Sequence, residues 1–381
     1  MAMTPPDAAR ERGGFSYRRR SRFKANRAAK TQRNTELRED KARTALVLGG
    51  GAPNMALMAG AIAAFAERGV VFDVISTSGA GSLAGLLWLA PKGQSAADAL
   101  RSVVTMSIAD SIYKLFPVNY KVFQKPGTWA DMWRQALATN PWFAVKVKDY
   151  EQSAPYALWA DWMALCAATL SPSGLTSSSW GLCAPIPFIE HLIDFDRMRH
   201  IKPHFYLNAY NATDQQIDDF TKEMITPEHF RAALAFPFIY GPYRLNGKLY
   251  YEGAVVDSLN FKDLVEKHVG LETIVVLDVL GSDLLIREPR DLYDSWVLSM
   301  IIPLVKAAED DLDLFAVKHN RGWRRADGAK TDLFKVEFDI PQQYHVEVLD
   351  WSASNASRLF EIGYQAGLKF SETHASHFLR S

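Results

Sequence analysis

Two apolar runs of strand length, each followed by a stretch of helical length, open the core-forming part of the chain. The runs are Thr44–Leu48, which leads into three glycines, and the hexapeptide VFDVIS. Both have the aliphatic and β-branched composition of a buried parallel strand. The segments after them predict two helices, one over Asn54–Arg68 with a stop at Gly69 and one from Ser82 to Pro91. The pattern therefore predicts a β-α-β-α unit with a right-handed crossover.

The pattern returns to strands in the second half of the chain. FYLNAYNA and YRLNGKLYYEGAVV come first, and the Asn246-Gly247 pair in the second stretch is typical of a type I′ hairpin. TIVVLDVL and LFKVEFDI predict two further strands, and SNASRLFEIGYQAGLKF predicts a late amphipathic helix. Since no internal repeat or linker divides the chain, we predict a single domain over residues 44–381.

Residues 105–200 have a different pattern, and we predict that they form a helical insertion packed over the sheet. Helical stretches such as PYALWADWMALCAATL alternate there with the Ser/Gly loop SPSGLTSSSWG. Six of the ten tryptophans fall in this segment: Trp129, Trp133, Trp142, Trp159, Trp162 and Trp180. Two interpretations stay open for these aromatic side chains, a lid or lipid-facing surface and an ordinary aromatic core.

Charge is distributed unevenly along the chain, although the chain as a whole is neutral. Residues 1–43 contain 13 Lys and Arg against 5 Asp and Glu, a net charge of +8, and the remainder carries −8. Because this basic stretch has few aliphatic side chains to bury, we predict a disordered arm over residues 1–43. An anionic membrane surface is its expected partner. A solvated tail and an organelle transit peptide are the alternatives, and no nucleic acid is expected as a partner.

Composition argues against several other classes of protein. The two cysteines, Cys166 and Cys183, are too few for a disulfide framework, which favours a cytoplasmic protein. The longest apolar run, Met55–Ala66, is shorter than the ~20 residues of a membrane-spanning helix, so a membrane contact would be peripheral. No cysteine or histidine spacing is typical of a zinc site, and we predict neither a metal nor a cofactor. The oligomeric state stays open.

Three short motifs follow one another in an order that has a chemical meaning. They are the triple glycine Gly49–Gly51, the elbow VISTSGAGSLAGLL and the acidic stretch YYEGAVVDSL. A tight turn of small residues between a strand and a helix is where an α/β-type hydrolase presents its nucleophile. The order and spacing resemble the patatin-like phospholipase family over residues 44–90 and 205–261. Members of that family have a glycine-rich oxyanion loop, a nucleophilic serine in G-x-S-x-G and an aspartate in D-G-G or D-G-A.

The resemblance implies an α/β fold, a patatin-like sandwich with a mostly parallel central sheet. It also implies hydrolysis of lipid or other acyl esters, as in lipid degradation, by a Ser–Asp dyad without a cofactor. An ungapped alignment with the family assigns the oxyanion N–H groups to Gly50, Gly51 and Ala52. It aligns the rest of the elbow and acidic motifs with Thr77, Gly81, Gly253 and Ala254. If the alignment of the glycine loop is shifted by one residue, Gly49–Gly51 match the three glycines of the family loop, but the alignment then requires an insertion downstream.

The departures from the family fall on the two catalytic positions. Gly79 stands where the resemblance implies the serine, and Glu252 stands where it implies the aspartate. One hypothesis is a lipid acyl hydrolase whose nucleophile is displaced to Ser78, with the longer Glu252 as its base. Neighbouring residues at a strand end point to opposite faces, which weighs against this hypothesis. A second hypothesis is that Glu252 activates water, and a third is a pseudoenzyme that binds a lipid or a protein partner.

Overall fold

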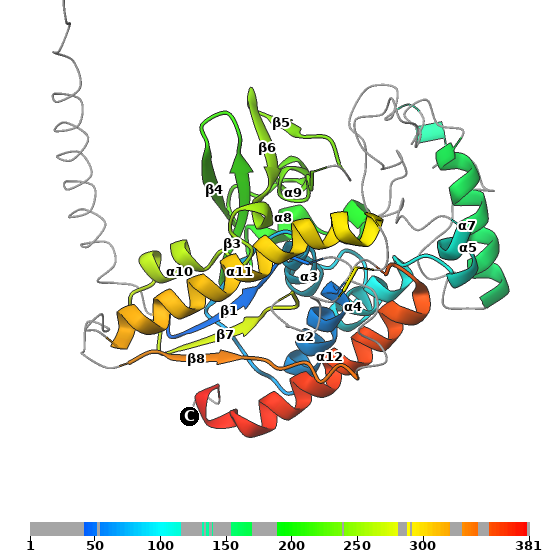
Figure 1. Cartoon of the computed structure of the whole chain (residues 1–381). Coiled ribbons are helices and arrows are strands. Elements are labelled where there is room, and N and C mark those ends of the chain that lie inside the picture. The colour runs from blue at the N-terminus through cyan, green and yellow to red at the C-terminus, as the bar shows by residue number, and fades with distance from the viewer. Residues whose placement is uncertain are drawn as a thin grey trace, which may run out of the picture.

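The computed structural model of the protein describes residues 42–51, 54–115, 154–169, 189–237, 240–280, 292–320, 330–341 and 350–378, with a few isolated positions between them. Within these ranges, eight strands form one sheet (Figure 1). The strands are β1 (Thr44–Leu48), β2 (Val74–Thr77), β3 (His204–Asn211), β4 (Gln216–Thr221), β5 (Tyr243–Leu245), β6 (Lys248–Glu252), β7 (Thr273–Leu277) and β8 (Asp332–Lys335).

In the described ranges, helices connect and follow these strands. The α-helices are α2 (Met55–Glu67), α3 (Ala80–Leu89), α4 (Ala96–Thr105), α5 (Asp110–Leu115), α7 (Ala154–Thr169), α8 (Phe195–Met198), α9 (Pro227–Ala233), α10 (Phe261–Lys267), α11 (Leu292–Asn320) and α12 (Ala353–Thr373). The part of the chain that the structure describes also contains three short 3₁₀ turns, η3 (Ile189–Leu192), η4 (Gly253–Val255) and η7 (Ala375–His377).

The centre of the sheet is a run of parallel strands in the order β3-β2-β1-β7-β8. Strand β1 is buried over its whole length, and its side chains alternate between two cores. Leu46 and Leu48 join the core built with α2, α3 and α12, while Ala45 and Val47 join the core built with α10 and α11. Figure 1 shows helices on both faces of the sheet. The α/β fold with a mostly parallel central sheet, expected from the sequence, is confirmed.

The pairing of strand β3 with two other strands determines the position of the acidic motif. Its first half pairs with β2, with Leu207 opposite Thr77, and its second half pairs with β6, with Ala209 opposite Glu252. Strand β4 pairs with both halves, so it must lie along the other edge. β2 and β6 therefore share one edge of β3, and β6 begins to pair where β2 leaves the sheet. This arrangement brings Glu252 to the elbow that follows β2.

The elements predicted from the hydrophobic pattern match the structure closely. Asn246 and Gly247 have φ angles of 50° and 79°, and Leu245 pairs with Lys248, as a type I′ hairpin requires. The second predicted helix begins two residues early, at Ala80. LFKVEFDI contributes only its first residues to a strand, which is β8. The pattern does not predict β4.

Two parts of the predicted domain organisation stay predictions. The basic arm, residues 1–43, lies outside the described residues except for Ala42 and Arg43. Between residues 105 and 200, the described elements are α5, α7, η3 and α8. No helix in the described ranges is both long enough and apolar enough to cross a bilayer.

Candidate active site

The predicted elbow is a sharp turn between the end of β2 and the start of α3. Gly79 is the turn residue, with φ +47° and ψ −124°, a backbone conformation that is strained for a residue with a side chain. The nucleophile of an α/β-type hydrolase occupies a strained turn of this kind. Gly81 lets α3 approach β1 closely, because a Cβ atom there would lie 2.6 Å from the carbonyl carbon of Leu48. The turn is therefore sharp enough for a nucleophile elbow, although residue 79 has no side chain.

The side chain of Glu252 fills the space above Gly79. A Cβ atom built on Gly79 would lie 2.9 Å from the carboxyl carbon of Glu252 and closer still to its Oε1. Glu252 is 6% exposed, and no described residue forms a hydrogen bond or an ion pair with its carboxyl group. Burial raises the pKa of this carboxyl from 4.5 to about 8. At neutral pH the group is therefore mostly protonated and uncharged.

Ser78 directs its hydroxyl group to the loop that follows Glu252. The side chain is fully buried, and its Oγ donates a hydrogen bond to the backbone carbonyl of Asp257 (2.8 Å). Asn208 Nδ2 donates to the same carbonyl (3.0 Å), and the Ser78 N–H donates to Leu48 O (3.0 Å). These bonds fasten the elbow to the acidic motif. A backbone carbonyl is not a base, so this contact does not activate the serine.

The other motif residues bring the glycine loop, the elbow and the acidic motif together. A Cβ atom on Gly50 would lie 2.6 Å from the Ala254 methyl group, and one on Gly79 would lie 3.2 Å from it. Ala254 thus packs between the two glycines, directly after Gly253. Thr77 Oγ1 donates to Tyr206 O (2.8 Å) and lies 3.0 Å from Ser82 Oγ, which ties the end of β2 to α3.

The glycine loop offers fewer free N–H groups than the resemblance implies. The Gly50 N–H already donates to Ser258 O (2.8 Å). The Gly51 N–H has no partner in the described part of the chain, and Gly51 has a φ of +123°. The third predicted donor, Ala52, lies outside the described residues. The Gly50 N–H could therefore stabilise an oxyanion at this elbow only if its hydrogen bond to Ser258 O breaks.

Comparison with known families identifies the chain. The sequence model of the patatin-like phospholipase family matches residues 46–265, which is more than half of the chain. The chain belongs to the patatin-like phospholipase family. Among solved structures, VipD from Legionella pneumophila is similar over 88% of this chain and 67% of its own, at 15% identity and a TM-score of 0.38. No curated protein matches the sequence.

Sequence reasoning missed the polar groups that surround the patatin-like acidic motif. Burial and the charge of Asp311 raise the pKa of Asp257 to about 6, and Asp257 Oδ1 accepts a hydrogen bond from the Asn260 N–H (2.7 Å). Asn208 and Asn260 are buried, and each has a side-chain oxygen without a partner in the described ranges. Asp257 is visible in YYEGAVVDSL, but no spacing marks Asn208, because the pairing of β3 with β6 brings it there.

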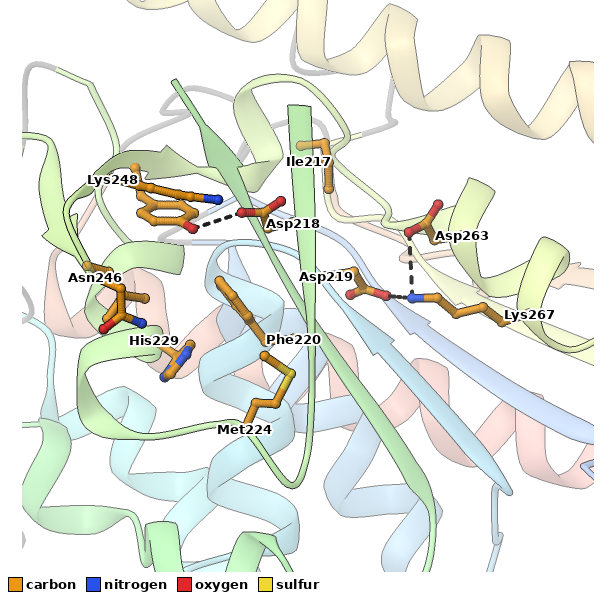
Figure 2. Close-up of a pocket in the computed structure, with 12 residues that line it drawn as sticks. Ile217, Asp218, Asp219, Phe220, Met224, His229, Asn246, Lys248, Asp263 and Lys267 are labelled. Carbon is orange, nitrogen blue, oxygen red and sulfur yellow. Dashed lines mark hydrogen bonds and ion pairs between the residues drawn. The ribbon is translucent and has the colours of Figure 1, made fainter. Parts of the chain in front are cut away.

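A cavity of about 440 Å³ lies away from the patatin-like elbow, against β4, the β5–β6 hairpin and α10 (Figure 2). Two of its acidic side chains have partners in the lining, since Tyr250 Oη donates to Asp218 (2.8 Å) and Lys267 forms an ion pair with Asp219, while Lys248 pairs with Asp214 outside it. None of the predicted site residues lines this cavity. Within the described ranges, no three His, Cys, Asp or Glu side chains are grouped to hold a metal ion.

Proposed function

We propose that this chain binds acyl lipids at its patatin-like site without forming a serine acyl-enzyme. The observation that carries the proposal is the position of Glu252, whose carboxyl group lies where a side chain on residue 79 would have to stand. A covalent mechanism needs a nucleophilic group at that corner with a base beside it. Here the corner has a glycine, and the carboxyl group fills the space of the missing side chain.

The hydrogen bonds of Ser78 support the same proposal. A displaced nucleophile would have to turn its hydroxyl group from the Asp257 carbonyl (2.8 Å) towards Glu252. That movement breaks the hydrogen bond from Ser78 to a buried carbonyl, which would keep only its bond from Asn208 Nδ2 (3.0 Å), and a typical hydrogen bond contributes about 0.5–1.5 kcal/mol. The fully buried position of Ser78 leaves little room for such a change. We therefore assign Ser78 to fastening the elbow rather than to attack on an acyl carbon.

Glu252 has the chemistry to bind an acyl group. Below its pKa of about 8 the carboxyl group is uncharged and has an O–H donor. The carbonyl oxygen of an acyl ester is a matching acceptor, and no described side chain competes for this donor. Family membership supports lipid acyl esters as the ligand class. The proposed site thus keeps the recognition of an acyl group and omits the covalent step.

Hydrolysis by a water molecule that Glu252 activates is a second candidate. A general base works best when its pKa lies near the working pH, and a pKa of about 8 meets this condition. The rate would rise as Glu252 loses its proton, so activity would increase through pH 8. No covalent intermediate would form, because water rather than a side chain attacks the ester.

Binding of a phospholipid analogue in which a hydrolysis-resistant amide replaces the ester, and which therefore keeps the acyl carbonyl, tests the first candidate. Wild-type protein should bind the analogue in an equilibrium titration and should hydrolyse no ester on either side of pH 8. Glu252→Ala should weaken binding by about tenfold, the value of one hydrogen bond to a buried group. Glu252→Gln is the matched control, because its amide still donates a hydrogen bond and should keep most of the affinity.

A fluorophosphonate probe, together with an acyl-ester assay, separates the remaining mechanisms. Labelling that disappears in Ser78→Ala would establish the displaced serine and contradict the proposal. Turnover without labelling, which rises through pH 8 and drops by about 10²-fold or more in Glu252→Gln, would select activated water. Absence of both labelling and ligand binding, in protein with a native circular dichroism spectrum, would leave lipid binding without support.

A further inference from the structure

Helix α7 turns apolar side chains towards solvent. Trp159 and Trp162 are 53% and 46% exposed, and Leu158 is 42% exposed. Successive residues of a helix are rotated by about 100°, so these three side chains lie within an arc of about 100°. Three large apolar groups on one side of one helix make a continuous exposed surface, which we call the α7 face (Leu158, Trp159 and Trp162). A soluble surface helix normally has the opposite arrangement.

The other side of α7 fixes its orientation. Asp161 and Ala160 are 2% and 1% exposed, and Asp161 Oδ2 accepts a hydrogen bond from the Ala109 N–H beside α5 (2.6 Å). Ala164 and Leu165 pack against the Ile108–Ile112 cluster. Asp161 is the only charged residue of the helix, and it faces inward. The α7 face therefore has no charged group.

Three properties of this face decide what can cover it. It has no charged group with which to recognise a charged partner surface, a property that a neutral lipid surface and the charge-poor core of a protein interface both match. Its indole groups are the side chains that proteins place at the boundary between lipid and water. The 16 residues of α7 span about 24 Å, too short to cross a hydrocarbon core of about 30 Å, so contact with lipid would be at the bilayer surface.

We propose that the α7 face docks onto the surface of a lipid bilayer, with Trp159 and Trp162 at the level of the head groups. Figure 1 shows α7 on the outside of the molecule, beyond α5 and away from the sheet, where a flat surface can reach it. The inference rests on the proposed function, because a bilayer is the source of the acyl lipids that the site would bind. Neutral head groups suffice, since the face has no charge for anionic lipids to match.

Sedimentation of the full-length protein with phosphatidylcholine vesicles tests the docking surface. Wild-type protein should bind these neutral vesicles, and added salt should not release it. Trp159→Gln/Trp162→Gln should lower the partition coefficient by about tenfold or more, because it removes most of the apolar area that enters the interface. Leu314→Gln/Val317→Gln on α11 is the matched control, since it removes side chains that are 50% and 44% exposed elsewhere and should change nothing.

Several results would overturn the proposal. Equal vesicle binding by wild type and the tryptophan variant, or no binding by wild type, excludes the α7 face as a membrane surface. A wild-type dimer that becomes a monomer in the tryptophan variant, without vesicle binding, would make the face a contact between two copies of the chain. The proposed function is tested apart from this by a soluble short-chain amide analogue, which keeps the acyl carbonyl and which wild type and the tryptophan variant should bind equally. Loss of that binding in both, with vesicle docking intact, would contradict the proposed function alone.

Discussion

Two residues, Gly79 and Glu252, carry the proposal for this patatin-like site. A glutamate reaches one methylene further than an aspartate, and its carboxyl group lies over the glycine of the elbow. A buried carboxylate without a hydrogen-bond partner is costly, and the group avoids this cost by retaining its proton. An uncharged acid is therefore present where a serine and a charged base would have to meet.

Restoring both family residues should produce more activity than restoring one. A serine at position 79 alone would collide with the carboxyl group of Glu252, which must move aside. In Gly79→Ser/Glu252→Asp the shorter acid makes room for the hydroxyl group. We expect probe labelling at residue 79 and measurable esterase activity in the double variant. Gly79→Ser alone should be at least about tenfold slower, since a misplacement of about 1 Å costs up to about 10²-fold.

The double variant also tests the glycine loop. One outcome is that the double variant folds, as judged by its circular dichroism spectrum and Tm, but neither reacts with the probe nor hydrolyses esters. In that case, catalysis at this site requires more than the two restored side chains. The bond from the Gly50 N–H to Ser258 O would then be the next candidate, because it occupies a donor that the oxyanion would need.

Glu252 should make the stability of the protein depend on pH. Its pKa is about 8 in the folded chain and near 4.5 in the unfolded chain. Between these values the unfolded state has released a proton that the folded state retains. The unfolding free energy therefore falls as pH rises, by up to about 1.4 kcal/mol per pH unit. The contribution of the protonated Glu252 carboxyl group to the unfolding free energy is fully present below pH 4.5 and is lost as pH rises through about 8.

Glu252→Gln removes this titration while keeping the shape of the side chain. The unfolding free energy of the variant, relative to wild type, should increase steadily as pH rises from 4.5 to about 8, as measured by urea denaturation. The comparison isolates Glu252, because Asp257 titrates in both proteins. A difference that does not change with pH would mean that Glu252 has an ordinary pKa in the folded chain.

At the scale of elements, helices α2 and α12 depend on glycines for their close contact. A Cβ atom on Gly363 of α12 would lie 2.7 Å from the carbonyl carbon of Leu57, and one on Gly60 of α2 would lie 2.7 Å from the Tyr364 N atom. Both contacts are with backbone, which cannot rotate away. The glycines in SNASRLFEIGYQAGLKF thus let two helices pack against each other at backbone distance.

Gly363→Ala should therefore destabilise the protein. Alanine favours a helix over glycine by about 1 kcal/mol, but the forced separation of the helices should outweigh this gain. We expect the unfolding free energy to fall by about 1–3 kcal/mol, as for other overpacked contacts. Ser357→Ala, at an exposed position of the same helix, should change it by less than about 0.5 kcal/mol. Equal effects of the two substitutions in urea denaturation would contradict this account of the helix contact.

At the scale of the whole molecule, the basic arm and the α7 face would contact a membrane by different physical means. The arm, residues 1–43, has a net charge of +8, and attraction between exposed charges is screened within about 10 Å at 0.1 M salt. Arm-dependent binding should require anionic lipid and decrease with salt. Binding through the α7 face should not require anionic lipid and should not decrease with salt, because that face has no charge.

Deletion of residues 1–41 tests the arm. The cut should fall before Ala42, which is 5% exposed, so that Arg43 O can still accept the hydrogen bond from the Glu272 N–H (2.7 Å). The truncated protein should bind anionic vesicles more weakly than the full chain at low salt and equally at high salt. Its binding to neutral vesicles should be unchanged. Equal binding to anionic vesicles at low salt by both proteins would show that the arm is only a solvated tail.

The sequence by itself determined the local elements and the family. Hydrophobic period, helix stops and the Asn246-Gly247 pair are local signals, and they predicted β1, α2 and the hairpin. The order of the three motifs identified the family that the comparison confirms. The sequence also predicts that Gly79 and Glu252 stand at the family's two catalytic positions, because an ungapped alignment needs no coordinates.

Only the tertiary structure decided what these replacements do. β2 leaves one edge of β3 where β6 begins to pair with it, and this brings Glu252 over Gly79 from a distant part of the chain. The same packing supplies Asp257 O to the Ser78 hydroxyl group and Ser258 O to the Gly50 N–H. A hydrogen-bond partner and a burial-shifted pKa are both properties of the neighbours in space. Neighbours in space depend on strand order and register, which the residues of one motif do not encode.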